Sequence, residues 1–374
     1  MINKGPLSPP PSTVGRGKRA QPTLLADATY RNPAIFASGQ TALYHNDFLN
    51  VYKSWPDPTV IISDGAYGVL GFDGDTADAS RLTDWYSPHI SAWSKKATPQ
   101  TTLWVWNTEV GWATLHPLLT EHGWKYVGLN IWDKGKAHIA GKNTTKLKRF
   151  PVVTEVCAQY VREATIQGLT VKEWLLFEWK RTGLPLYEAN IAAGVKSAAT
   201  RKYFDQGHLW YPPPPEAFIK LVHYANLKGD PAGRPYYSLN GKRPATKEEW
   251  LKLFPKFNPI HGYTNVWKRP ALKGKERVSL DKNGAAAHLN QKPLDLMRLL
   301  IEASSDPGDV VWEPFGGLFT GTLAAYLTSR KGFGSEIDRD YYLMGIHRIQ
   351  SALVGSSTAR PLPQQPFLYG ERNE

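Results

Sequence analysis

The sequence is poor in sulfur and in long apolar runs. It has one cysteine, Cys157, and three methionines among 374 residues. A single cysteine excludes a disulfide within the chain and a zinc site made of cysteines, which is typical of a cytoplasmic protein. A membrane-spanning helix needs about 20 consecutive apolar residues, and no segment approaches that length. We therefore expect no membrane association.

Acidic residues are also in short supply. Asp and Glu number 33 against 45 Lys and Arg, so the formal net charge is +12. Such an excess favours a polyanionic partner, most simply nucleic acid, although an ordinary basic enzyme can show the same balance. No acid precedes Asp27. The Pro-rich start therefore predicts a disordered basic arm over residues 1–25, and an organellar transit peptide would have a similar composition.

The rest of the chain can build a large core, since 41% of its residues are apolar and 14 are Trp. Residues 26–161 and 271–354 both alternate short β-rich runs with helical patterns, which predicts an α/β fold made of two halves. Residues 162–270 are helical, basic and broken by proline-rich pieces, so we expect a separate, mainly helical region there. Residues 355–374 lack periodicity and are predicted to form a loose tail.

Individual elements follow from apolar periodicity. Strands are predicted within residues 59–64, 101–107, 123–135, 151–161, 309–315 and 331–338. Helices are predicted within residues 293–305, 320–330 and 341–354, where apolar residues recur every three or four positions.

The stretch "LPLYEANIAAGVKSAATRKYF" (residues 184–204) predicts two short helices joined near Gly194. That spacing is compatible with a helix-turn-helix, whose second helix would carry the DNA-contacting residues Lys196, Arg201 and Lys202. Ordinary surface helices show the same pattern.

The stretch "VVWEPFGGLFTG" (residues 310–321) predicts a strand, a glycine loop and a helix, which is a common way to bind a nucleotide-like cofactor. The next strand ends at Glu336, in position to accept hydrogen bonds from ribose hydroxyls. A dinucleotide such as NAD is one candidate, but its fingerprint needs three spaced glycines at a pyrophosphate. Here Gly316 and Gly317 are adjacent, and the acid Glu313 would repel phosphate. S-adenosylmethionine is cationic and has no phosphate, so it fits better.

Two further segments have the composition of a site. In "HLNQKPLDLM", Asn290, Gln291 and Lys292 directly precede a helix, where they suit a carboxylate ligand or simple capping. In "IISDGAYGVLGF", Asp64 ends a buried strand and Tyr67 follows three residues later. Taken alone, this second segment would be read as a structural turn.

Together these motifs resemble those of the amino-group DNA methyltransferases, which act on N6 of adenine or N4 of cytosine. That family has a D-P-F-x-G-x-G-T cofactor loop, a catalytic D/S-P-P-Y and, in one class, a T-Q-K-P segment. The chain has Glu313–Gly317 for the first, Asp64–Tyr67 for the second and residues 290–293 for the third. The motif order is that of the β class. It implies a Rossmann-like methyltransferase sheet with permuted motifs and a DNA-recognition region inserted at residues 162–270.

The resemblance also implies roles for the catalytic residues. Asp64 would accept one N–H of the target amine and the carbonyl of Gly65 or Ala66 the other, so that the nitrogen lone pair is freed for attack. The target base would leave the helix, and Tyr67 would stack on it.

The cofactor roles come from the same resemblance. The methionine part of S-adenosylmethionine would lie against Glu313 and Gly317, with Phe315 packed nearby. Glu336 would bind the ribose, and Asp47 would lie near the adenine. The carboxylate would be held by the segment Asn290, Gln291 and Lys292.

The partner expectations follow the family as well. They are double-stranded DNA, a homodimer and a partner restriction nuclease, in a bacterial or phage-encoded restriction-modification setting. The sequence alone does not separate these settings.

The chain departs from the family pattern at two loops. Gly65 and Ala66 replace the proline pair, and Leu318 and Phe319 replace the second glycine region, where Phe319 could narrow the cofactor pocket. Asp64 favours adenine N6 as the target, whereas the neighbouring Ser63 and the lost prolines favour cytosine N4. An inactive DNA-binding protein on the same scaffold and an NAD-linked oxidoreductase are the alternatives from other classes.

Overall fold

The computed structural model describes residues 35–38, 40–69, 75, 78–140, 147–195, 199–279, 287, 288 and 290–356. The predicted basic arm, Lys196 and residues 357–374 of the predicted tail lie outside these ranges. Within them, no helix is both long and apolar enough to cross a membrane.

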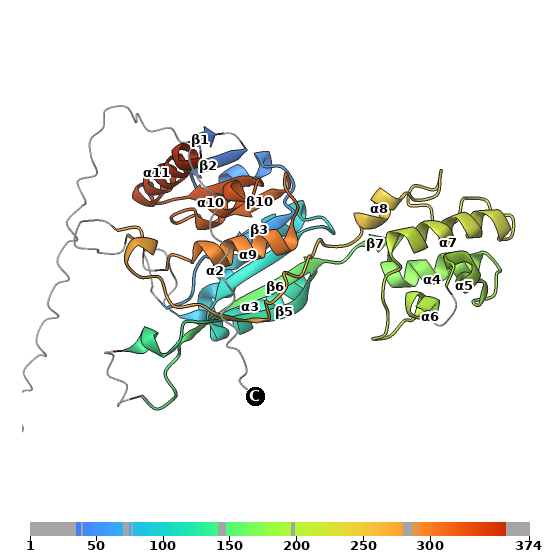
Figure 1. Ribbon diagram of the computed structural model, residues 1–374, viewed down its shortest axis with the longest axis horizontal. Coiled ribbons are helices and arrows are strands. Elements are labelled where there is room, and N and C mark those ends of the chain that lie inside the picture. The colour runs from blue at the N-terminus through green and yellow to red at the C-terminus, as the bar shows by residue number, and fades with distance from the viewer. Residues whose placement is uncertain are drawn as a thin grey trace, which may run out of the picture.

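A nine-stranded sheet forms the body of the protein (Figure 1). In sheet order its strands are β1 (Ile35–Ser38), β2 (Thr41–His45), β11 (Lys331–Glu336), β10 (Val310–Glu313), β3 (Val60–Ser63), β4 (Thr102–Asn107), β6 (Thr154–Arg162), β5 (Trp124–Asp133) and β9 (Val266–Lys268). The five strands from β2 to β4 are parallel, β1 and β6 are antiparallel to their neighbours, and β5 and β9 run with the parallel set. The predicted α/β class is confirmed, as are the predicted strands.

The two halves of the predicted fold meet at the centre of this sheet. Strand β10 lies beside β3, with Val311 opposite Val60 and Trp312 opposite Ile61. The chain proceeds from β10 to β11 on one side and from β3 to β4 on the other. A reversal of this kind leaves a crevice at the carboxyl ends of the two strands, where doubly wound sheets bind their ligands. We call this end of the sheet the carboxyl edge, and the opposite end the amino edge.

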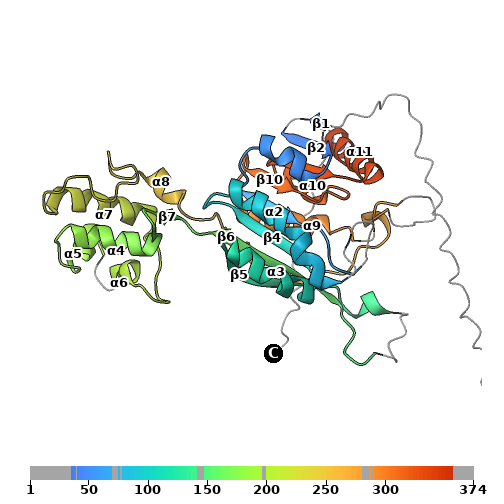
Figure 2. The ribbon, with the colours of Figure 1, turned by 180° about the vertical axis from the view of Figure 1, so that it is seen from behind.

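Helices cover both faces of the sheet (Figures 1 and 2). On one face α1 (Phe48–Val51), α2 (Leu82–Lys96) and α3 (Glu109–Glu121) share an apolar cluster with the sheet residues Ile61 and Trp312. On the other face α9 (Leu294–Ser304) and α10 (Thr320–Leu327) pack against Val60 and Val311. Adjacent residues of one strand thus serve opposite cores, which explains the continuous apolar runs of these central strands. Helix α11 (Arg339–Ser356) packs against β2.

A second unit, residues 163–265, is mainly helical and has its own core. It contains α4 (Val171–Arg181), α5 (Glu188–Ala193), α6 (Ala199–Phe204), α7 (Pro215–Lys228), α8 (Lys247–Leu251) and the short strands β7 (Thr165–Ile166) and β8 (Leu169–Thr170). Its core is rich in aromatic residues, and the rings of Phe218 and Trp250 stack 4.0 Å apart. The two short helices predicted on either side of Gly194 are present as α5 and α6.

The helical unit leaves the sheet at its amino edge. Arg162, the last residue of β6, lies opposite Trp124, the first residue of β5. Val161 likewise lies opposite Thr102, where β4 begins. Figure 1 shows the unit standing clear of the sheet at that end. The region predicted to end at residue 270 therefore rejoins the sheet slightly earlier, at β9.

Candidate active site

Asp64 directly follows β3 at the carboxyl edge. Its Oδ1 atom accepts hydrogen bonds from the Tyr67 hydroxyl at 2.9 Å and from Lys292 Nζ at 2.8 Å. Among the described residues, nothing donates to the other carboxylate oxygen, Oδ2. The carboxylate is therefore held by one oxygen and has the second available for a substrate donor.

Lys292 is the cation at the centre of this site. Its side chain is 1% exposed, and Nζ also lies 3.4 Å from the Glu155 carboxylate and 3.1 Å from the carbonyl of Asn290. Burial alone would lower the pKa of Lys292, but the charges of Asp64 and Glu155 outweigh it and raise the pKa above its usual value. The ammonium group thus stays charged and ties two carboxylates together.

Glu155 is the site residue that was not predicted. It lies in β6 and binds three groups, the ammonium groups of Lys134 and Lys292 and, at 3.4 Å, the hydroxyl of Tyr67. Burial would raise the pKa of Glu155, but the two lysines outweigh burial and lower it. A signal was available, because Glu155 is the one charged residue in "FPVVTEVCAQYV", and a buried strand rarely holds an acid without a partner.

The loop after Asp64 is fixed by hydrogen bonds to its backbone. Asp75 accepts from the amides of Tyr67 and Gly68 at 2.9 and 2.8 Å. The carbonyl of Ala66 accepts from Asn107 Nδ2 at 3.0 Å and from the Tyr86 hydroxyl at 3.2 Å. The Ala66 carbonyl is therefore already engaged, and of the two carbonyls predicted to face the target amine, that of Gly65 is the better candidate.

The small space around residue 65 explains why it is a glycine. A Cβ at this position would lie 2.7 Å from Phe315 Cδ2 and 2.8 Å from the Tyr86 hydroxyl, which is too close for a carbon atom. Phe315 packs with its centroid 4.9 Å from the rings of both Trp85 and His89. The proline usual in the family has no room here, because the side chains of α2 and the cofactor loop fill its place.

Tyr67 itself is only 5% exposed, and its ring packs into the apolar cluster under α9. The prediction that it stacks on the target base stays a prediction.

The cofactor loop is held by Glu313. Its Oε1 accepts from the amide of Gly321, and its Oε2 accepts from the amide and hydroxyl of Thr322, each at 2.7 Å. Burial raises the pKa of Glu313 to about 7. Both oxygens thus bind the start of α10, where amides without helical partners attract an acid. A direct contact of Glu313 with a cofactor stays a prediction.

Phe319 lies in the core behind the glycine loop. It is fully buried against Leu43 and Tyr342, and a Cβ on Gly316, Gly334 or Gly345 would overlap its ring. The glycines therefore form the slot that accommodates this large residue. The ring enters the core between the sheet and α11. The expectation that Phe319 narrows the cofactor pocket stays a prediction.

Glu336 ends β11 beside the glycine loop. Its Oε2 accepts from the amide of Gly317 at 2.6 Å, and its Oε1 accepts from the amide of Asp338 at 2.8 Å. Burial raises the pKa of Glu336 to about 7. Gly317 has a left-handed φ of 50°, and a Cβ there would meet His288 at 3.5 Å. The loop, His288 and Glu336 are thus close neighbours.

Other predicted site residues have structural partners. Gln291 is 8% exposed, and its amide group bonds the carbonyl of Glu276 and the amide of Val278, each at 3.0 Å. Asp47 caps α1 by accepting from the amide of Leu49 at 2.8 Å. The carboxylate-binding role of Gln291 and Lys292 and the adenine contact of Asp47 stay predictions.

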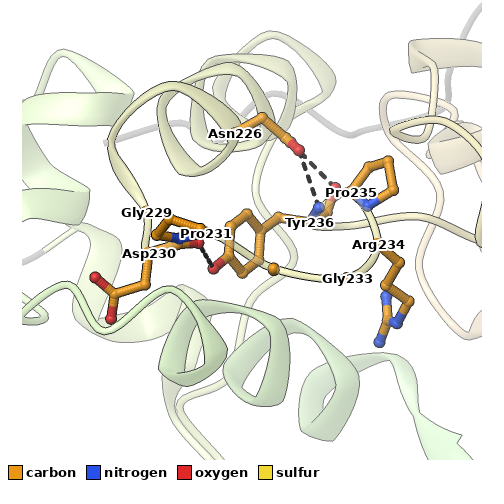
Figure 3. A pocket seen from close by; sticks show the side chains of 9 residues that line it. Asn226, Gly229, Asp230, Pro231, Gly233, Arg234, Pro235 and Tyr236 are labelled. Carbon is orange, nitrogen blue, oxygen red and sulfur yellow. Dashed lines mark hydrogen bonds between the residues drawn. The ribbon is translucent and has the colours of Figure 1, made fainter.

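The predicted DNA contacts lie in the helical unit, where Arg201 and Lys202 are exposed on α6. The same unit has a hollow of about 330 Å³ lined by residues 226 and 229–236 (Figure 3). Its wall is braced internally, since Asn226 bonds the backbone of Tyr236 and the Tyr236 hydroxyl bonds the carbonyl of Asp230 at 2.5 Å. This hollow is remote from Asp64 and belongs to the fold of the unit.

The carboxyl ends of β2, β10 and β11 present side chains that suit S-adenosylmethionine. The carboxylates of Asp47, Glu336 and Asp338 lie at the ends of β2 and β11, which are paired from Gly332 to Glu336. Gly317 supplies a surface without a side chain. A cationic ligand without phosphate suits this acidic lining. In the described part of the chain, no group of three His, Cys, Asp or Glu side chains could hold a metal ion.

Comparisons with known proteins agree with this arrangement. The sequence model of a DNA methylase family matches residues 59–346. The DNA adenine methyltransferase YhdJ of Escherichia coli (strain K12) is 40% identical over 88 residues, which are 24% of this chain and 28% of that protein. The Type II methyltransferase M.HinfI of Haemophilus influenzae is 39% identical over 77 residues, 21% of each chain. The matches thus span less than a third of either relative.

Among solved structures, the cytosine-N4-specific PvuII DNA methyltransferase aligns with 83% of this chain and 87% of its own. The TM-score is 0.50 at 13% sequence identity. At that identity the likeness shows a shared fold.

Proposed function

The chain belongs to the DNA methylase family, and from this premise we propose that it moves a methyl group from S-adenosylmethionine to an exocyclic amine of duplex DNA, with N6 of adenine as the target. The observation that carries the proposal is the Asp64 carboxylate, presented at the carboxyl edge with one oxygen bound and one available. The named adenine specificity of the Escherichia coli relative supports the choice of base.

The residues suggest how the amine is activated. Its lone pair is delocalised into the ring, so the nitrogen must move toward tetrahedral geometry before it can attack. Asp64 Oδ2 accepts one N–H, and the Gly65 carbonyl accepts the other. The cofactor, when bound, would supply the methyl group from its sulfonium and leave as a neutral thioether, and the proton lost by the methylated amine would pass to solvent. Positioning and fixed charge therefore carry the rate enhancement.

Lys292 and Glu155 act through Asp64. The ammonium group fixes Oδ1, and Glu155 fixes the ammonium group from the other side. Tyr67 adds a third support through its hydroxyl. The proposed target base lies against this tyrosine after leaving the helix, a step that costs a few kcal/mol.

Nucleoside mass spectrometry of plasmid DNA incubated with the protein and S-adenosylmethionine tests the proposal. We expect N6-methyladenine. N4-methylcytosine would retain the mechanism and replace the base, which the neighbouring Ser63 and the fold of the PvuII enzyme make the second candidate. No methylated base on DNA of varied sequence, together with tight DNA binding, would establish an inactive DNA-binding protein instead.

The affinity for S-adenosylmethionine should depend on Glu336 and on pH. Because burial raises its pKa to about 7, the ionised carboxylate that accepts ribose hydroxyls forms only as pH rises through that value. Calorimetry on the wild type should therefore show affinity increasing from about pH 6 to about pH 8. Glu336→Gln should bind several-fold more weakly at the higher pH and lose the dependence. If the dependence persists in the variant, Glu313 is its source and the ribose role is wrong.

Further contacts complete the proposal. Arg201 and Lys202 of α6 are proposed to bind DNA phosphates, with Lys196 as a third member of that set. The Type II name of the Haemophilus influenzae relative supports a restriction-linked setting, with a partner nuclease and a homodimer as its proposed assemblies.

A further inference from the structure

The connection between β5 and β6 carries an unusual charge. Residues 134–154 contain five lysines, one arginine and no acid, in a chain whose formal net charge is +12. The structure describes residues 134–140 and 147–154 of this stretch, and we call these two described pieces the basic connection. Such a run of one sign is not required by the fold, because paired strands need only a short turn.

The basic connection begins and ends beside the candidate active site. Asp133 and Thr154 form the last pair of the β5–β6 ladder, which ends at the carboxyl edge. Lys134 binds Glu155, and Glu155 in turn contacts Lys292 and Tyr67. Figure 1 shows the connection projecting beyond the sheet, at the end opposite the helical unit. A ligand bound at Asp64 would thus lie near its base.

The end of the connection combines cations with apolar groups. Lys148 and Arg149 are exposed and, in the part of the chain described, form no ion pair. The ring of Phe150 is 93% exposed, and Leu147 and Val152 are 48% and 41% exposed. Phosphate groups would neutralise the cations, and stacked bases offer the flat apolar surface that suits an exposed aromatic ring.

We propose that the basic connection is a contact surface for duplex DNA, in which Lys148 and Arg149 bind backbone phosphates and Phe150 packs against the base stack beside the displaced target base. The proposal rests on the proposed function, which brings DNA to the carboxyl edge. The helical unit leaves from the amino edge, whereas the basic connection is a charged segment that starts at the rim of the site.

Phosphate contacts can be counted through the salt dependence of DNA binding, which changes by about 0.9 logarithmic units per contact. Lys148→Ala/Arg149→Ala in the full chain should lower the slope of log affinity against log salt by about 2. The probe is a fluorescently labelled duplex of mixed sequence, followed by anisotropy. An unchanged slope would overturn the proposal.

A matched control removes the same charge at the amino edge. Lys331 begins β11 opposite Val310, and Lys95 lies in the last turn of α2, which returns the chain to the start of β4. Lys95→Ala/Lys331→Ala should leave the slope unchanged. An equal fall in both double variants would also overturn the proposal, because it would show a general charge effect. The salt slope of Arg201→Ala/Lys202→Ala measures the phosphate contacts of the helical unit separately.

Phe150 has its own test. Phe150→Ala should weaken duplex binding roughly 10-fold, the effect of one lost aromatic–base contact, and Phe150→Trp should restore it. Equal affinity of the alanine variant and the wild type would reject the stacking role.

Neither binding test depends on methyl transfer. A wild type that binds duplex DNA but transfers no methyl group would defeat the proposed activity alone. A wild type that methylates DNA, with the slope unchanged in Lys148→Ala/Arg149→Ala, would defeat this inference alone.

Discussion

Replacing Asp64 by alanine is expected to lower methyl transfer to DNA by roughly 10²- to 10³-fold, the usual cost of one fixed polar partner of the transition state. Asp64 presents the acceptor at the carboxyl edge. Among the described carboxylates, Asp64 and Glu155 both contact Tyr67 and Lys292, and Asp64 is the closer of the two. Transfer of a radiolabelled methyl group to plasmid DNA measures the loss. Affinity for S-adenosylmethionine, measured by calorimetry, should change little, because Asp64 belongs to the loop of β3 and not to the glycine loop.

Asp64→Asn is the matched control for this experiment. It retains a carbonyl oxygen that can accept from the amine but loses the charge that pairs with Lys292. We expect it to retain part of the activity that the alanine variant loses. Turnover of Asp64→Ala equal to that of the wild type would remove Asp64 from the mechanism.

Replacing Lys292 by methionine should destabilise the fold by about 3–5 kcal/mol, the usual cost of removing one partner of a buried ion pair. The substitution conserves an unbranched apolar stem and leaves Asp64 and Glu155 without their shared cation, in a site where the lysine side chain is 1% exposed. Denaturant unfolding at about pH 8 measures the difference in the free energy of unfolding. Methyl transfer should fall as well, because Asp64 loses the contact that fixes its Oδ1.

The pH dependence of this loss has a definite sign. In the wild type the two lysines lower the pKa of Glu155, so its contribution to stability is present above the usual value and is lost as pH falls. Without Lys292, one of the two charges that lower the pKa of Glu155 is missing, so ionised Glu155 contributes less to stability. The difference between wild type and variant should therefore stay constant from about pH 8 to about pH 5, and shrink only as pH falls below the usual value of a glutamate, where Glu155 takes up a proton.

The double variant Lys292→Met/Glu155→Gln separates the pair from general disruption. Removing the second charge should recover part of the lost stability, with a coupling of about 0.5–3 kcal/mol. Strictly additive effects would show that Lys292 stabilises the site through its other contacts, the Asp64 carboxylate and the rings of Tyr67 and Trp106, and not through Glu155.

The sequence determined the α/β class, the strands β3 to β6, β10 and β11, the helices α5, α6 and α9 to α11, and the motif order that resembles the family. It did not predict β1, β2, β9 or the individual helices α1 to α3. These properties can be predicted locally, because apolar periodicity and the positions of glycines are visible within a window of neighbouring residues. Within the helix predicted over residues 293–305, the apolar residues Met297, Leu300 and Ile301 are buried in α9, and Leu294 at its start is half-buried. Phe319 shows the limit of local reasoning, since its slot is made by glycines on a loop, a strand and a helix.

Only the tertiary structure decided which charges meet. Lys292 lies between Asp64 and Glu155, because β3, β6 and the start of α9 converge at one edge of the sheet. Its predicted role at the cofactor carboxylate stays a prediction. The direction of β6 likewise sets the helical unit at the amino edge and the basic connection at the carboxyl edge. Sequence periodicity reveals that a strand is buried. Its direction and its neighbours depend on packing between segments that are far apart in the sequence.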